Sequence, residues 1–270
     1  MKIADKTVLI TGAGSGIGAA LARRCASMGA RVCVSDRDGE KAAQVAGEIG
    51  GLAMVCDVTS EAQVRELVEA AEAGLGPVDL FVSNAGLGHG DPSHAASASN
   101  EVWELNWQVH VMAHVFAARA LLPGMLARGS GYFVNVASAA GLLNQIGDAA
   151  YSATKHAAVS FAESLAITHG QEGIGVSVVC PQYVATPLIG LDASAADGAN
   201  SLLTAEDVAE AVVKGVEARD FLILPHPAVA KYAALRGQDH GRWITGMQML
   251  RAKAMTELGG LNLKEFYKLV

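Results

Sequence analysis

Short apolar runs alternate along the chain with longer stretches in which apolar residues recur every three or four positions. The short runs, such as Val8-Leu9-Ile10, are typical of strands buried on both faces of a sheet, and the longer stretches are typical of helices. Strands are predicted at residues 7–11, 30–36, 51–58, 78–84, 131–138, 174–181 and 221–224, and helices at residues 17–28, 38–49, 60–73, 100–128, 150–172 and 205–218. This alternation predicts an α/β fold: a doubly wound, seven-stranded parallel sheet with helices on both faces.

The last part of the chain, residues 225–270, follows the final predicted strand and is expected to be helical. It is too short for an independent domain, so residues 1–270 are predicted to form one domain with a C-terminal extension that acts as a lid or a subunit contact. Trp243, Met247, Met249 and Leu250 form an apolar group in it, for which packing in the core or against another subunit is the favoured interpretation.

Composition excludes several classes of protein. Lys and Arg number 20 against 27 Asp and Glu, a formal charge of −7, which argues against a nucleic-acid-binding protein. Hydrophobic residues make up 51% and charged residues 17%, unlike a disordered chain. No secretory leader and no membrane-spanning run is recognised, and the four widely spaced cysteines fit free thiols. A cytoplasmic protein without membrane contact is expected.

A glycine-rich segment, Thr11-Gly12-Ala13-Gly14-Ser15-Gly16-Ile17-Gly18, joins the first predicted strand to the first helix. Glycines let the backbone approach a pyrophosphate, and free N–H groups at a helix start bind its oxygens. Asp36 ends the second predicted strand, where its carboxylate can accept hydrogen bonds from the ribose hydroxyls of a dinucleotide. That carboxylate would repel a 2′-phosphate, which favours NAD over NADP, whereas the adjacent Arg37 could pair with the phosphate.

A second group of candidate residues is Ser138, Tyr151 and Lys155. Tyr151 and Lys155 are four residues apart on a predicted helix and share one face. The ammonium favours the phenolate and so is expected to lower the Tyr151 pKa, while Ser138 can hydrogen-bond the same substrate oxygen. Such a Tyr/Lys pair alone is common on solvated helices, but the glycine-rich turn on the same chain favours a catalytic role.

These residues resemble a known family. Thr11-Gly12-x-x-x-Gly16-x-Gly18, Asn84-Ala85-Gly86, Ser138 and Tyr151-x-x-x-Lys155 are similar, in order and spacing, to the short-chain dehydrogenase/reductase family over about residues 6–224. The resemblance implies a Rossmann fold, NAD(P)-dependent oxidation of an alcohol or reduction of a carbonyl, and a homo-oligomer, either tetramer or dimer. The cofactor contacts expected from the turn and the resemblance are Gly12, Ser15, Gly16, Ile17, Gly18, Asp36, Arg37, Asp57, Val58, Asn84, Ala85, Gly86, Tyr151, Lys155, Pro181, Val184 and Thr186.

The chain departs from the family at two positions. Gln182 stands where a glycine usually follows the proline, and His110 occupies the helix position of the family's fourth catalytic residue, an asparagine. In the family that asparagine helps to distort the helix, so that a main-chain carbonyl holds a water leading from the lysine to solvent. We expect His110 to keep this relay and to add an imidazole that titrates near neutral pH. The alternative is an ordinary buried histidine that lowers activity.

The predicted function is therefore an NAD-dependent oxidoreductase that interconverts a secondary alcohol and a ketone, with Ser138, Tyr151, Lys155 and His110 as catalytic residues. The alternatives are an NADPH-preferring carbonyl reductase and a nucleotide-binding homologue without turnover. Substrate contacts are expected in loops 89–99, 142–149 and 186–203. No metal is expected, because His89 and His94 lie in a loop that fits the substrate rim better.

Overall fold

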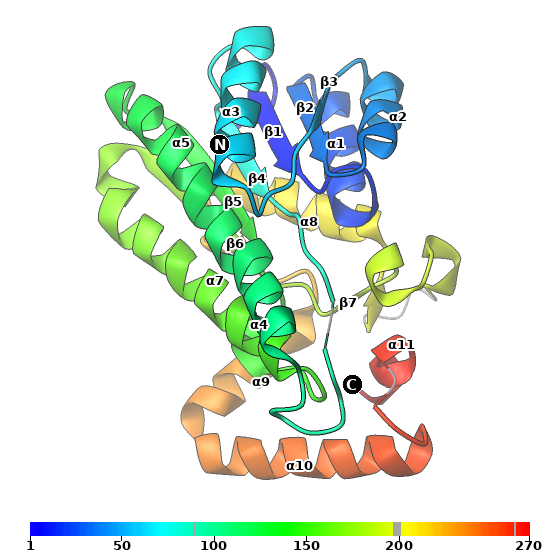
Figure 1. Cartoon of the computed structure of the whole chain (residues 1–270). Helices are drawn as coiled ribbons and strands as arrows, with labels where there is room; N and C mark the ends of the chain where they lie inside the picture. The colour runs from blue at the N-terminus through cyan, green and yellow to red at the C-terminus, as the bar shows by residue number, and fades with distance from the viewer. Residues whose placement is uncertain (89, 197–200, 262) are drawn as a thin grey trace.

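The central sheet has seven parallel strands in the order β3-β2-β1-β4-β5-β6-β9. The computed structural model describes residues 1–88, 90–196, 201–261 and 263–270 (Figure 1). The strands are β1 (Thr7–Thr11), β2 (Arg31–Asp36), β3 (Leu52–Val55), β4 (Leu80–Ser83), β5 (Gly131–Val136), β6 (Ile174–Val179) and β9 (Leu222–Ile223). The predicted seven-stranded parallel sheet is confirmed, although several strands are shorter than expected.

Helices cover both faces of this sheet, as the alternating pattern predicted. One face packs against α1 (Gly16–Ser27), α2 (Gly39–Ile49) and α8 (Ala205–Ala218), and the other against α3 (Glu61–Leu75), α5 (Ala113–Ala127) and α7 (Ala149–His169). Each face has its own apolar core, and both cores consist largely of small and β-branched side chains. Strands β1, β5 and β6 are buried on both sides, which explains their continuous apolar sequences.

Strand β1 marks the point where the strand order reverses, because β2 and β4 flank it on opposite sides. The connections leaving β1 and β4 therefore diverge, and a crevice opens at the carboxyl ends of these strands. The glycine-rich turn after β1 and Asn84 after β4 both lie at this edge.

The predicted helix 100–128 is interrupted. It consists of α4 (Asn100–Trp107), a π-helical turn η1 (Gln108–Met112) and α5. By length and mean hydropathy (1.4) the stretch Asn100–Ala127 resembles a membrane span, but 56% of its most apolar window is buried inside the protein. Length and apolar composition carry little weight here, because a buried core helix satisfies both.

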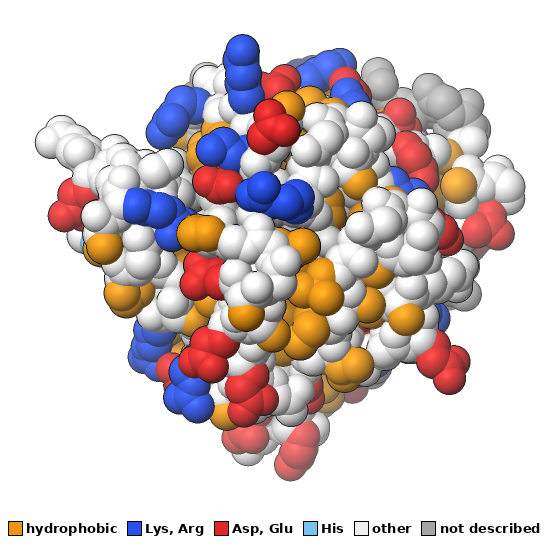
Figure 2. Space-filling model, turned by 90° about the horizontal axis from the view of Figure 1, so that it is seen from above, with side chains coloured by type: hydrophobic (Ala, Val, Ile, Leu, Met, Phe, Trp, Pro, Cys, Tyr) orange, Lys and Arg blue, Asp and Glu red, His pale blue; other side chains and the backbone are white. Residues whose placement is uncertain are grey.

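Beyond the sheet, small elements gather at the carboxyl ends of the strands. They are α6 (Ala140–Leu143), a two-stranded sheet of β7 (Tyr183–Val184) and β8 (Leu202–Leu203), and the C-terminal helices α9 (Pro227–Gln238), α10 (His240–Glu257) and α11 (Leu263–Phe266). Helix α9 packs against α6, and α10 crosses this end of the molecule (Figure 1). On the opposite end, acidic and basic side chains are mixed around a central apolar area (Figure 2).

Candidate active site

The turn between β1 and α1 consists largely of glycine, so its backbone is not covered by side chains at the edge of the sheet. Gly12 has φ +62°, and a Cβ there would lie 2.7 Å from the Cα of Ala85. A Cβ on Gly18 would lie 2.4 Å from the carbonyl oxygen of Gly12, so both positions require glycine. No side chain caps α1, since Ser15 at its N-cap makes no such hydrogen bond. The first N–H groups of α1 therefore face the crevice as an anion site, which fits a dinucleotide pyrophosphate.

Asp36 lies beside this turn. One of its carboxylate oxygens accepts the N–H of Gly14 at 2.9 Å and the other accepts the N–H of Asp38 at 3.0 Å. The carboxylate is thereby fixed at the end of β2, where ribose hydroxyls of a bound dinucleotide would lie. Arg37 is exposed next to it. Asp57 uses one oxygen to accept from both the N–H and the hydroxyl of Thr59, at 2.9 and 2.8 Å, so it shapes the start of α3.

Asn84 joins β4 to the glycine-rich turn. Its amide nitrogen donates to the carbonyl oxygens of Thr11 and Gly12, both at 3.0 Å. The hydroxyl of Thr11 accepts the backbone N–H groups of Asn84 and Ala85 at 3.1 and 3.3 Å. These bonds hold the end of β4 against the glycine-rich turn.

Tyr151, Lys155 and Ser138 meet between α7 and the end of β5. The N-cap Asp148 accepts the N–H of Tyr151 at 3.0 Å, which places the tyrosine in the first turn of α7. The Nζ of Lys155 lies 5.6 Å from the Tyr151 ring centroid and donates to the carbonyl oxygen of Val136 at 3.1 Å. The Ser138 hydroxyl accepts the N–H of Ala140 at 3.1 Å and lies close enough to Tyr151 to lower the pKa of its phenol. The predicted group is therefore assembled in space.

The pKa values of this group differ from the expectation. Burial of the phenol raises the pKa of Tyr151 to about 12, and the hydrogen bond with Ser138 opposes that rise. The expected lowering of the Tyr151 pKa by Lys155 is not found, so at neutral pH Tyr151 is a neutral phenol. Burial lowers the pKa of Lys155 to about 8, because the apolar surroundings disfavour its ammonium form.

His110 lies in the π-helical turn, fully buried. Its Nε2 accepts the N–H of Leu87 at 3.2 Å, and its Nδ1 lies 3.1 Å from the hydroxyl of Thr154. Because Leu87 can only donate, the proton of the neutral ring resides on Nδ1 and is donated to Thr154. The ring also packs edge-on against Tyr151, with 5.3 Å between centroids. The expected helix distortion is present even though histidine replaces asparagine.

The expectation that His110 titrates near neutral pH is wrong. Burial lowers its pKa well below 6.5, and the charge of Lys155 lowers it further. Protonation would also turn Nε2 into a donor facing the N–H of Leu87. One helical turn later, burial lowers the pKa of His114 to about 3. Both histidines are therefore neutral around the candidate site.

The segment after β6 completes the site. The carbonyl oxygen of Pro181 accepts the N–H of Ala139 at 2.7 Å, and a Cβ on Gly16 would lie 3.3 Å from the methyl group of Thr186. Val184 is buried in β7, so this segment runs between the glycine-rich turn and Ser138. These positions border the crevice where the nicotinamide end of a dinucleotide would lie.

Sequence reasoning missed His226. Its Nδ1 accepts the N–H of Gln182 at 3.0 Å, so its Nε2 carries the proton and donates to the carbonyl oxygen of Tyr183 at 2.9 Å. This fully buried ring fastens the segment after β6 to the start of α9. Its only sequence signal was its place between two prolines, Pro225 and Pro227.

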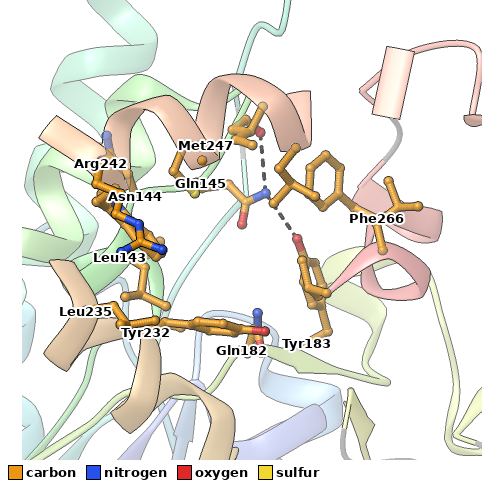
Figure 3. A pocket seen from close by; sticks show the side chains of 18 of the residues that line it. Leu143, Asn144, Gln145, Gln182, Tyr183, Tyr232, Leu235, Arg242, Met247 and Phe266 are labelled. Carbon is orange, nitrogen blue, oxygen red and sulfur yellow. Dashed lines mark hydrogen bonds between the residues drawn. The ribbon is translucent and has the colours of Figure 1, made fainter. Parts of the chain in front are cut away.

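A pocket of about 400 Å³ opens beside this site (Figure 3). Its lining includes Ala139 and Ala140, which directly follow Ser138, and also Gln182 and Tyr183. Trp243, Met247 and Leu250 line it from α10, whereas Met249 is 69% exposed. Trp243 and Leu250 also pack against clusters of buried apolar residues, as the favoured interpretation expected, and they line the pocket in addition.

The predicted substrate loops contribute unequally to this pocket. Loop 142–149 supplies Leu143, Asn144, Gln145 and Ile146, whereas the described parts of loops 89–99 and 186–203 supply none of its lining. His89 lies outside the described residues, and His94 accepts the N–H of Ala96 at 3.2 Å within its own loop. No group of three potential metal ligands occurs among the residues that the structure describes.

Comparison with known proteins gives one consistent result. The sequence model of the short chain dehydrogenase family matches residues 6–196. The 1-deoxy-11-beta-hydroxypentalenate dehydrogenase of Streptomyces exfoliatus is 34% identical over 77% of this chain and 78% of its own length. The cis-4-hydroxycyclohexanecarboxylate dehydrogenase of Sinomonas cyclohexanicum is 34% identical over 77% of this chain and 88% of its own.

A similar solved structure is a crystal structure of a short chain dehydrogenase/reductase from Burkholderia phymatum in complex with NAD. It is 31% identical, covers 88% of this chain and 95% of its own, and superposes with a TM-score of 0.80. The family model, the two relatives and the solved structure thus all indicate the same protein family.

Proposed function

The chain belongs to the short-chain dehydrogenase family and is an oxidoreductase that acts on CH–OH groups. We propose that it interconverts a secondary alcohol and a ketone with NAD as cofactor. The names of both relatives specify a hydroxylated substrate, which supports an alcohol as the reduced form. The NAD in the Burkholderia phymatum structure and the position of Asp36 support NAD rather than NADP.

Three side chains carry the proposed proton transfer. Tyr151 takes the hydroxyl proton during oxidation and returns it during reduction, and Ser138 holds the substrate oxygen by a hydrogen bond. Lys155, one helical turn from Tyr151, contributes positive charge and binds the nicotinamide ribose. NAD, when bound, supplies the hydride acceptor, and the positive charge of its ring favours the Tyr151 phenolate.

The glycine-rich turn and its neighbours hold the cofactor in this proposal. The N–H groups at the start of α1 bind the pyrophosphate near Gly12, Ser15 and Ile17. Asp57 and Val58 border the adenine, Asn84, Ala85 and Gly86 border the ribose, and Pro181, Val184 and Thr186 border the nicotinamide. His110 positions Tyr151 and leaves the main chain of the π-helical turn available for a water relay.

The meeting of Tyr151, Lys155 and Ser138 between α7 and the end of β5 is the observation that carries the proposal. With an alcohol that the parent oxidises, followed as NADH absorbance, Tyr151→Phe should lower kcat about 10²- to 10⁴-fold, because the phenol is the acid and base. Tyr267→Phe, a tyrosine outside the site, is the matched control. Near-parental turnover of Tyr151→Phe would refute the proposed role.

Cofactor choice is tested by quenching of protein fluorescence on titration with NADH and NADPH. The proposal expects tighter binding of NADH. Tighter binding of NADPH would assign the exposed Arg37 to a 2′-phosphate and make the protein an NADPH-preferring reductase.

The proposed enzyme acts on a small molecule in the cytoplasm as a homo-oligomer. Four buried free cysteines support a reducing compartment. Ile167 on α7, 83% exposed, supports a subunit contact. Light scattering coupled to size exclusion tests the oligomer, and a monomer at micromolar concentration would contradict it.

A further inference from the structure

The pocket beside Ser138 is walled largely by the C-terminal segment. Its apolar side chains include Tyr232 and Leu235 from α9, Trp243, Met247 and Leu250 from α10, and Phe266 from α11. The volume, about 400 Å³, is within the range of about 300–1,000 Å³ usual for small-molecule sites. If the proposed function holds, the pocket receives the part of the alcohol that does not react, and its walls select a bulky apolar body.

The polar groups at the floor of the pocket are neutral. The side-chain amide of Gln145 donates to the hydroxyl of Tyr183 at 3.3 Å and to the carbonyl oxygen of Ile146 at 3.4 Å (Figure 3). Burial raises the pKa of Tyr183 to about 12, so its hydroxyl stays protonated. Ala139 and Ala140, which directly follow Ser138, line the same pocket, so this floor lies beside the candidate active site. The part of the substrate that contacts this floor therefore needs no charged group.

The opposite wall carries a cation. Arg242 lines the pocket near the start of α10, on the same side as Asn144 and across from Phe266 (Figure 3). None of the ion pairs among the described residues includes Arg242. Asp239 also lines the pocket, and one of its carboxylate oxygens accepts the backbone N–H of Arg242 at 2.9 Å. By contrast, Arg236 on α9 donates to the carbonyl oxygen of Leu142 at 2.7 Å.

Arg242 is exposed at the rim of the pocket and takes part in none of the ion pairs among the described residues, so its planar guanidinium can donate two parallel hydrogen bonds to a carboxylate. We propose that the substrate is a secondary alcohol with a bulky apolar body and a carboxylate remote from the hydroxyl, and that Arg242 binds this carboxylate. Arg242 is then a specificity-determining residue, and the proposal rests on the proposed function of the neighbouring site.

The test uses alicyclic secondary alcohols of one to three rings, each as the carboxylic acid and as its methyl ester. The parent should oxidise the best acid with a kcat/KM about 10- to 100-fold above that of its ester. Arg242→Met, which keeps the length of the side chain, should bring the ratio of acid to ester close to one through a higher KM for the acid. Arg242→Lys should restore part of the ratio, and the control Arg251→Met, on α10 outside the pocket, should leave it unchanged.

An equal kcat/KM of the parent for acid and ester, or a parental ratio in Arg242→Met, would overturn the assignment of Arg242. Failure of the proposed function is separate: no alcohol in the panel reduces NAD. In that event calorimetric titration of the acids and esters into the NADH complex decides. Preference for the acid that is lost in Arg242→Met supports the proposal, and equal binding overturns it.

Discussion

Replacing His110 by leucine tests how the candidate site is held together. The substitution leaves the N–H of Leu87 without its acceptor, whereas the hydroxyl of Thr154 keeps the carbonyl oxygens of Ala150 and Tyr151 within 3.0 Å. The N–H of Leu87 is partly buried, so its loss of an acceptor costs toward the low end of about 1–3 kcal/mol, and we expect His110→Leu to lower the free energy of unfolding by about 1 kcal/mol. For a chain of this length that corresponds to a melting temperature about 2–4 °C lower.

The same substitution separates positioning from titration. Because His110 stays neutral and carries its proton on Nδ1, it should produce no inflection in the pH dependence of kcat/KM between pH 5.5 and 8. His110→Asn, which restores a polar side chain, should recover part of the lost stability and give a pH profile parallel to that of the parent. Melting followed by circular dichroism and initial rates across this pH range supply both measurements.

His240→Leu, an exposed histidine at the start of α10, is the control and should change neither measurement. An inflection near pH 6–7 in the parent that disappears in His110→Asn would refute the neutral ring. An unchanged melting temperature in His110→Leu would show that the bond from Leu87 contributes nothing.

Three further predictions concern stability, rate and cofactor. Burial lowers the pKa of His114 to about 3, whereas the pKa in the unfolded chain is about 6.5, so below pH 6.5 the unfolded state binds more protons than the folded state. Unfolding in urea should therefore show that His114 makes the protein about 2 kcal/mol less stable at pH 5 than at pH 7.5. His114→Leu should remove that part of the loss. Because burial raises the pKa of Tyr151 to about 12, the rate of alcohol oxidation should rise from pH 7 to pH 9 as the phenolate fraction grows, and a flat profile would exclude Tyr151 as the titrating base. Asp36→Ala should weaken NADH binding about tenfold and raise the relative affinity for NADPH in the fluorescence titration; an unchanged ratio would contradict the position given to Asp36.

The fold was predictable because its signals are local. Buried parallel strands require continuous apolar runs, and the turn after β1 requires glycine at Gly12 and Gly18, where a Cβ would strike backbone. The pairing of Tyr151 with Lys155 follows from helix geometry alone. The π-helical turn was not predictable, since residues 109–118 are apolar at nearly every position and so show no phase shift in the helical pattern.

The pocket and the electrostatics of the site depend on contacts between distant parts of the chain. The role of Trp243 depends on α10 packing over a segment that begins near Leu143, and no pattern within either segment specifies that contact. The tautomer of His110 likewise depends on Leu87 and Thr154, which lie 23 and 44 residues away along the chain. The Tyr151 pKa was expected to fall because Lys155 was visible in the sequence, whereas the burial that raises it was not.

The two hydrogen bonds of the His226 ring suggest how relatives with the same catalytic residues can differ in substrate choice. The proton-transfer residues lie within the stretch shared with the family, residues 6–196, whereas most of the apolar pocket wall comes from a segment after it. Exchange of residues 227–270 between relatives would therefore alter substrate choice while the sheet and Tyr151 stay as they are. Such a chimaera must retain His226 in the recipient, because the N–H of Gln182 and the carbonyl oxygen of Tyr183 both bind that ring. His226 is thus the natural boundary for recombining a catalytic scaffold with new specificities.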